Sequence, residues 1–65
     1  MNGKELLRKL ERKGCVAVRQ SGSHAVVRCP GGCQTTVPKH STDLPAGTLA
    51  SIKRHLGGCI DTSDL

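Results

Sequence analysis

The 65-residue sequence contains no phenylalanine, tyrosine or tryptophan. Its interior must therefore be built from Leu, Ile, Val, Ala and Cys side chains, which supply little buried volume per residue. A chain this short leaves much of its surface exposed and is usually only marginally stable alone. These limits favour ordered packing of helices on a sheet, support from a partner protein, or an added staple. They leave room for a shallow site and exclude a deep substrate pocket.

The sequence also lacks a long apolar run. No segment approaches the ~20 apolar residues that would span a bilayer. Residues 1–13 carry charges throughout, which is unlike the apolar core of a secretory signal peptide. We therefore expect one domain, residues 1–65, located in the cytoplasm.

Acidic residues are scarce. The sequence has ten Lys and Arg residues against five Asp and Glu, a formal net charge of +5. All ten basic residues lie between Lys4 and Arg54, a span with only three acids, Glu5, Glu11 and Asp43. A small basic body favours polyanionic partners, because each phosphate that it neutralises releases counterions. The alternative is a solvated surface that keeps the protein soluble.

The first residues predict a helix over about Gly3–Lys13. Asn2 can serve as its N-cap, and Glu5 then falls at the third helical position, as in a variant of the capping box. Gly14 suits the position just past the helix end. The apolar face contains Leu6, Leu7 and Leu10, and a second face carries a basic stripe of Lys4, Arg8 and Arg12.

Two strands are predicted next, over Cys15–Gln20 and His24–Cys29. In the first, alternation places Val16 and Val18 on one face and Ala17 and Arg19 on the other. In the second, we prefer the register that buries no histidine or arginine. That register turns Ala25, Val27 and Cys29 inward and His24, Val26 and Arg28 outward.

A third strand is predicted over Gln34–Val37, ended or placed at a sheet edge by Pro38. A second helix begins near Leu44–Ala46, with Asp43 as a plausible cap. Its apolar stripe is formed by Leu49, Ile52 and Leu56. Cys59–Leu65 could add a short strand or fray. The result is a small α+β fold of order α-β-β-β-α, with two helices on one face of a three-stranded antiparallel sheet.

The connection between the first two strands carries the main functional signal. Arg19 precedes a Ser-Gly-Ser turn, and His24 opens the next strand directly after it. Gly22 can adopt the positive φ that such turns need, and this geometry would bring the Arg19 and His24 side chains close together. The alternative is an ordinary hairpin with a surface histidine.

With these residues in place, the chain resembles the HicA family of bacterial toxins over nearly its whole length. The resemblance is carried by the opening helix ending in Gly14, by Arg19 with Gly22-Ser23-His24, by Val37-Pro38 and His40, and by Pro45–Leu49 leading into Ile52. It implies a fold similar to a double-stranded RNA-binding domain, RNA-cleaving activity with His24 as the catalytic histidine, and a HicB-type antitoxin that covers the active face. The hairpin Cys29–Cys33 departs from the family's plainer turns.

Metal-independent RNA cleavage needs a base for the 2′-hydroxyl proton and an acid for the 5′-oxygen, and histidine suits either role. Together with the resemblance, this implies a cofactor-free endoribonuclease acting on mRNA, which we expect to be monomeric when free. Arg19, Arg28 or Lys39 would stabilise charge on the phosphate, and Lys4, Arg8 and Arg12 would contact the RNA backbone. His40 is a second proton-transfer candidate, but a loop role is favoured. The competing function is a non-catalytic RNA-binding or adaptor module.

The four cysteines allow several interpretations. With the histidines they could hold zinc, but C-x3-C is looser than the usual spacing and no second matched pair follows. A Cys29–Cys33 disulfide is geometrically possible but disfavoured in a reducing cytoplasm. We expect no metal site, with Cys15 and Cys59 as small buried apolar residues and Cys29 and Cys33 as free thiols near the turn.

Overall fold

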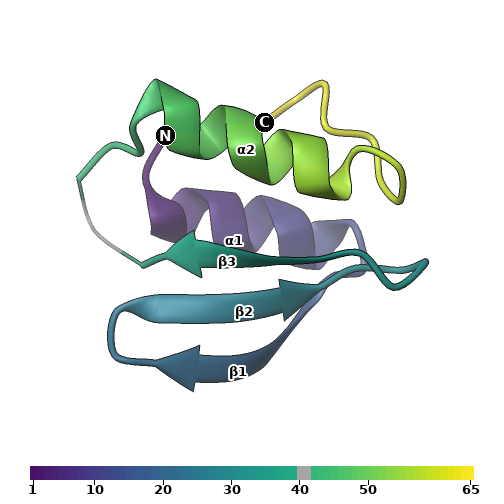
Figure 1. Ribbon diagram of the computed structural model, residues 1–65, viewed down its shortest axis with the longest axis horizontal. Coiled ribbons are helices and arrows are strands. Elements are labelled where there is room, and N and C mark those ends of the chain that lie inside the picture. Colours follow the sequence, from purple (N-terminus) through teal and green to yellow (C-terminus); the bar gives the residue numbers. More distant parts are fainter. Residues whose placement is uncertain (40–41) are drawn as a thin grey trace.

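The computed structural model describes residues 1–39 and 42–65. The elements follow the order α1 (Gly3–Arg12), β1 (Val16–Ser21), β2 (His24–Arg28), β3 (Gln34–Pro38) and α2 (Ala46–Leu56). The three strands form an antiparallel sheet in the order β1-β2-β3. Figure 1 shows α1 behind the sheet and α2 alongside β3. The predicted α+β fold is confirmed.

Helix α1 begins and ends where the sequence predicts. The Asn2 side chain accepts a hydrogen bond from the Glu5 N–H at 2.9 Å, which caps the first turn. At the other end Gly14 has φ +91°, and the Gly14 and Cys15 N–H groups donate to the Glu11 and Leu10 carbonyls. This pair of hydrogen bonds is the Schellman arrangement, which satisfies two carbonyls of the last turn.

The core is aliphatic and lies between the helices and one face of the sheet. The inward set on β2 is as predicted, with Ala25 and Val27 each 1 % exposed. Val27 belongs to one cluster with buried side chains from both helices and from β3, namely Leu6, Leu10, Val37, Ile52 and Leu56. His24, Val26 and Arg28 turn to the other face, hereafter the open face, which neither helix covers.

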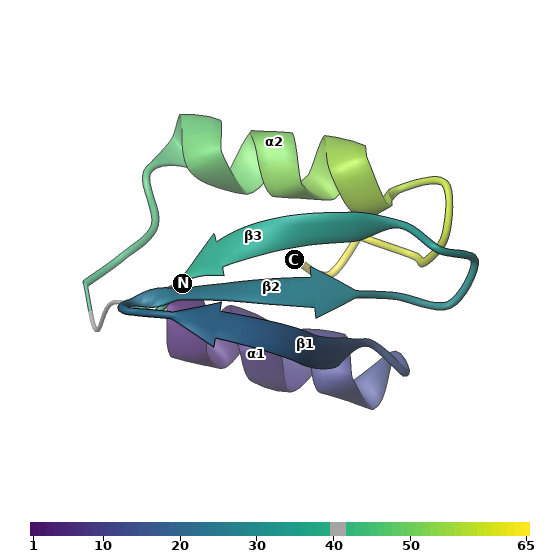
Figure 2. The same cartoon turned by 60° about the horizontal axis from the view of Figure 1, so that its bottom comes forward.

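Strand β1 differs from the predicted alternation. Ala17 lies opposite Val27, but Arg19 lies opposite Val26, so Val18 is an extra residue in the strand. This β-bulge moves Arg19 from the predicted face of Ala17 to the face of Val16, because residues paired across two strands share a face. Val16 and Arg19 therefore lie together on the open face. All six residues of β1 are exposed, and Figure 2 shows β1 at the end of the sheet opposite to the α2 side.

Two predictions about the second half of the chain are wrong. Asp43 does not cap α2: Pro45 is the N-cap residue, without a side-chain hydrogen bond, and the Asp43 carboxylate lies 3.3 Å from the Met1 amino group. Residues 59–65 neither pair as a strand nor fray. Leu65 is only 9 % exposed in the core, and Lys13 Nζ lies 2.8 Å from the Asp64 carboxylate.

The prediction for the cysteines is also wrong. Cys15 is bonded to Cys29 and Cys33 to Cys59, so none of the four is a free thiol. Cys15 is buried as predicted, but Cys59 is only partly buried. Cys29, predicted to be a free thiol near the turn, is buried, and its bond to Cys15 joins the beginning of β1 to the end of β2. Two disulfides thus supply the added staple, one of the three supports expected for so small a core without aromatic residues.

Candidate active site around His24

The hairpin between β1 and β2 places His24. Ser21 and His24 are partners across the two strands, so Gly22 and Ser23 alone form the loop. Gly22 has φ +59° and Ser23 does not have a positive φ, which fits a type II′ hairpin turn. His24 therefore opens β2 at the tip of the sheet, with an exposed side chain on the open face.

A pocket of about 300 Å³ adjoins His24. Pro38, the cross-strand partner of His24, forms one wall, and the segment leading into α2 forms the other. The pocket lining joins His24 to the polar residues Thr42, Asp43 and Thr48, and its apolar walls are completed by Leu44 and Pro45. This shallow, partly polar hollow is the size of a small-molecule site.

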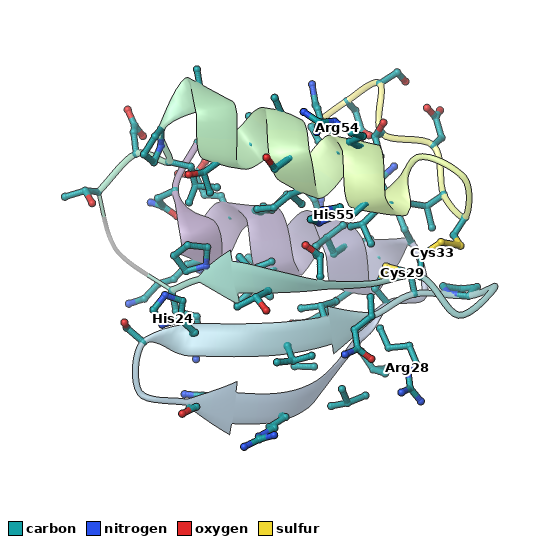
Figure 3. All side chains as sticks on the ribbon, viewed as in Figure 1. His24, Arg28, Cys29, Cys33, Arg54 and His55 are labelled. Atoms are coloured by element: carbon teal, nitrogen blue, oxygen red, sulfur yellow. A yellow bond between two sulfur atoms is a disulfide. The ribbon has the colours of Figure 1, made fainter. Side chains whose placement is uncertain are left out.

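The predicted basic residues do not form one surface. Arg19 on β1 lies opposite Val26 on β2, and Val26 is two residues from His24 along β2. Arg19 therefore shares the open face and lies close to the histidine. Arg28 shares that face but lies four residues along β2, about 13 Å away at the usual rise of a strand. Figure 3 shows His24 and Arg28 at opposite ends of the sheet. Of Arg19 and Arg28, Arg19 is therefore the closer to His24 on the open face.

Arg28 is instead fixed by Gln34. Its guanidinium Nε and Nη2 donate to Gln34 Oε1 at 3.3 and 3.2 Å across the paired strands. This contact orients the positive charge at the far end of the open face.

Lys39 is turned away from His24. Its Nζ donates to Gln20 Oε1 at 3.3 Å. Gln20 lies opposite Ala25, whose side chain is buried toward the helices, so this contact crosses the helix-facing side of the sheet. The Lys39 ammonium group therefore does not share the face of His24.

The stripe of Lys4, Arg8 and Arg12 lies on a second surface. All three side chains are exposed on α1. At 100° per residue they point directly away from Leu6 and Leu10, which face the core. The stripe is thus directed away from the sheet, and the structure does not bring it together with His24.

The prediction for His40 lies outside the described residues.

Sequence reasoning missed one candidate histidine. His55 in the last turn of α2 has Nδ1 3.1 Å from the Thr35 hydroxyl, and Thr35 is buried on β3. In the sequence His55 follows Lys53 and Arg54 in the last helical turn, where positive charge is favoured, and nothing local marks it as a site residue. The hydrogen bond depends on α2 packing beside β3, which no local sequence pattern reveals.

Among the described residues, no group of three or more His, Cys, Asp or Glu side chains is arranged to hold a metal ion. Neither helix in residues 1–39 and 42–65 has the length and apolar character to cross a membrane.

A comparison against known protein families identifies the class of protein. Residues 3–57 match the family described as the HicA toxin of bacterial toxin-antitoxin systems. That span covers most of the chain, so the class of protein is a toxin of a toxin–antitoxin system. The protein belongs to the HicA toxin family. No curated protein and no solved structure gave a match.

Proposed function

We propose that this protein is an endoribonuclease toxin that cleaves mRNA without a metal ion and uses His24 as its proton-transfer group. The observation that carries the proposal is the position of His24: exposed at the hairpin tip, beside a pocket of about 300 Å³, with Arg19 on the same face. Membership of a toxin family adds the expectation of a growth-inhibiting activity. The whole chain, residues 1–65, would act as one domain in the cytoplasm, as a monomer when free.

RNA carries its own nucleophile, so the protein has to supply proton transfer and charge stabilisation. The 2′-oxygen attacks the adjacent phosphorus, and the bond from phosphorus to the 5′-oxygen breaks. Neutral His24 would take the 2′-hydroxyl proton, because imidazole exchanges protons near neutral pH. The 5′-oxygen takes a proton from solvent or a pocket group, which gives a 2′,3′-cyclic phosphate and a 5′-hydroxyl. Arg19 would stabilise the negative charge on the phosphate.

RNA binding would involve both basic surfaces. Arg19 and Arg28 line the open face, where a strand passing His24 would lie. Lys4, Arg8 and Arg12 would contact phosphates elsewhere on the RNA, and Lys39 would add charge at the hairpin end. Such contacts are independent of sequence and weaken as salt rises.

The partner of the toxin would be a HicB-type antitoxin. Membership of a toxin–antitoxin family implies an antitoxin. The open face and β1 carry the two large apolar side chains most exposed to water, Val16 at 56 % and Val18 at 48 %. A protein that covered this face would bury both valines and close access to His24.

A second function, RNA binding without catalysis, is favoured by one observation. The Lys4, Arg8 and Arg12 stripe lies away from His24 and needs no chemistry to hold RNA. The two functions separate on expression in bacteria. We expect the parent to arrest growth and to shorten mRNA half-lives, and a His24→Ala variant, produced at equal level, to do neither. Equal arrest by both proteins would favour the non-catalytic function.

A further inference from the structure

A second hollow lies beside the His24 pocket. It measures about 420 Å³ and is formed by one edge of β3 and the facing side of α2, and its lining is Gln34, Thr35, Thr36, Thr48, Ser51, Ile52 and His55. We call it the β3–α2 groove. Thr48 also lines the His24 pocket, so the two hollows are neighbours. Figure 3 shows His55 between α2 and β3.

The edge of β3 offers backbone hydrogen bonds to this groove. The Cys29 N–H donates to the Cys33 carbonyl at 2.8 Å, and the Lys39 N–H donates to the Ser23 carbonyl. Because inward-bonded residues alternate along an antiparallel strand, the odd-numbered residues of β3 bond to β2. Thr36 therefore turns its N–H and C=O outward, and no described residue pairs with them. A donor and an acceptor lie side by side at the groove wall.

The side chains of the groove suit a nucleobase. Hydroxyls of Thr36, Thr48 and Ser51 can donate and accept hydrogen bonds. His55 is anchored through Nδ1 to Thr35, which leaves the ring face and Nε2 for a ligand. RNA-binding proteins stack bases on Phe, Tyr, Trp, His or Arg. With no Phe, Tyr or Trp in the sequence, a histidine ring in a groove is the best stacking surface that this chain can provide.

We propose that the β3–α2 groove is a nucleobase subsite, which holds a base next to the linkage cleaved at His24 and contributes to the choice of RNA sequence. The base would stack on His55 and hydrogen-bond through its edge to the Thr36 backbone and to Ser51. Thr36 lies two residues along β3 from Pro38, the partner of His24, or about 7 Å at the usual strand rise. The site thus lies within one or two nucleotides of the proposed cleavage point. This inference rests on the proposed ribonuclease function.

The test measures binding separately from cleavage. The His24→Ala protein, labelled with nitrogen-15, is titrated with AMP, CMP, GMP and UMP and, in parallel, with inorganic phosphate. We expect at least one nucleotide to shift the backbone amides of Thr36, Ser51 and His55 with a saturating curve, while phosphate does not. No saturable shift in the groove with any nucleotide, or the same shifts with phosphate alone, would overturn the subsite.

Variants in the same background sharpen the result. His55→Ala removes the stacking ring, and Ser51→Leu fills the groove. Each is expected to weaken the preferred nucleotide about tenfold, within the range for loss of one base stack. The matched control is Arg54→Ala, an exposed neighbour on α2 that does not line the groove. Thermal unfolding of each variant checks that it is folded, and equal weakening by Arg54→Ala would count against the proposal.

Two other outcomes are informative. Nucleotide binding in the groove together with normal RNA cleavage by His24→Ala would retain the subsite and reject the catalytic role of His24. Loss of cleavage in His24→Ala without nucleotide binding in the groove would retain the catalytic role of His24 and reject the subsite. Groove shifts seen with an antitoxin but with no nucleotide would make β3 a protein-docking edge and overturn the nucleobase proposal.

Discussion

Cys15 and Cys29 are joined by a disulfide that ties the residue before β1 to the residue after β2. The second disulfide, Cys33–Cys59, ties the start of β3 to the segment after α2. The first bond lies within the sheet and the second connects the sheet to the end of the helix that packs beside it, in a chain whose core has no aromatic side chain. We infer that the cross-links carry much of the stability of this small fold.

Removing the second cross-link should destabilise the protein strongly. A Cys33→Ala/Cys59→Ala variant opens a loop with a sequence separation of 26, for which loop-closure entropy gives about 3.5 kcal/mol. We expect a lower midpoint in thermal unfolding followed by circular dichroism, and a larger drop when the parent is reduced with dithiothreitol, which opens both cross-links. Thiol titration of the unfolded, unreduced parent should find no reactive thiol. Four reactive thiols and an unfolding midpoint indifferent to reductant would contradict this prediction.

Asp64 should titrate below its ordinary range. The Lys13 ammonium group, 2.8 Å away, holds the pKa of the Asp64 carboxyl below its usual 3.8. The stabilisation from this contact is present above the unfolded-state pKa and is lost as pH falls through the lowered folded-state pKa. Carbon-detected NMR titration should show the pKa of Asp64 rising toward 3.8 in Lys13→Ala.

Asp61 provides the control for that experiment. Its pKa is lowered chiefly by a hydrogen bond from the Ser63 backbone N–H, with Lys13 a smaller cause. The Lys13→Ala change should therefore move Asp61 much less than Asp64. Equal movement of both carboxyls would indicate that Lys13 acts through the general field of the protein and not through a direct contact with Asp64.

Removing a charge from the open face and removing one from the α1 stripe should have different effects on kcat and KM. Arg19→Ala is expected to lower kcat by about 10²-fold, because it removes a charge next to the reacting phosphate. Arg8→Ala should leave kcat unchanged, raise KM, and reduce the salt slope of RNA binding by about 0.7 for one single-strand phosphate contact. Steady-state cleavage of a short fluorescent RNA gives both constants. A larger kcat loss in Arg8→Ala than in Arg19→Ala would reverse the assignment of the surfaces.

The sequence was sufficient to predict the helices, the strands and the buried positions of the core. The Asn2 cap, the Gly14 stop and the inward positions of β2 are local features, set by hydrogen bonds or periodicity within a few residues. The alternation in residues 15–20 gave the wrong faces, because a bulge inserts Val18 without any glycine or proline to mark it.

Longer-range pairings could not be predicted. Asp43 is a reasonable cap by position, but the folded chain brings the Met1 amino group to it. The cysteine connectivity and the Leu65 contact with the core depend on α1, α2 and the sheet coming together, as does the Thr35–His55 hydrogen bond. His24 was found because its signal, a Ser-Gly-Ser turn before a strand, is local, and its role in catalysis stays a prediction.

Cleavage of a purified RNA is the most direct test of the central claim. The parent and His24→Ala proteins, each shown to be folded by circular dichroism, are incubated with a 5′-labelled RNA in the presence of EDTA, and the single-turnover rates are compared. We predict that the parent yields products ending in a 2′,3′-cyclic phosphate and that the variant is at least 10²-fold slower. Equal rates for the two proteins would contradict the assignment of His24 as the catalytic group.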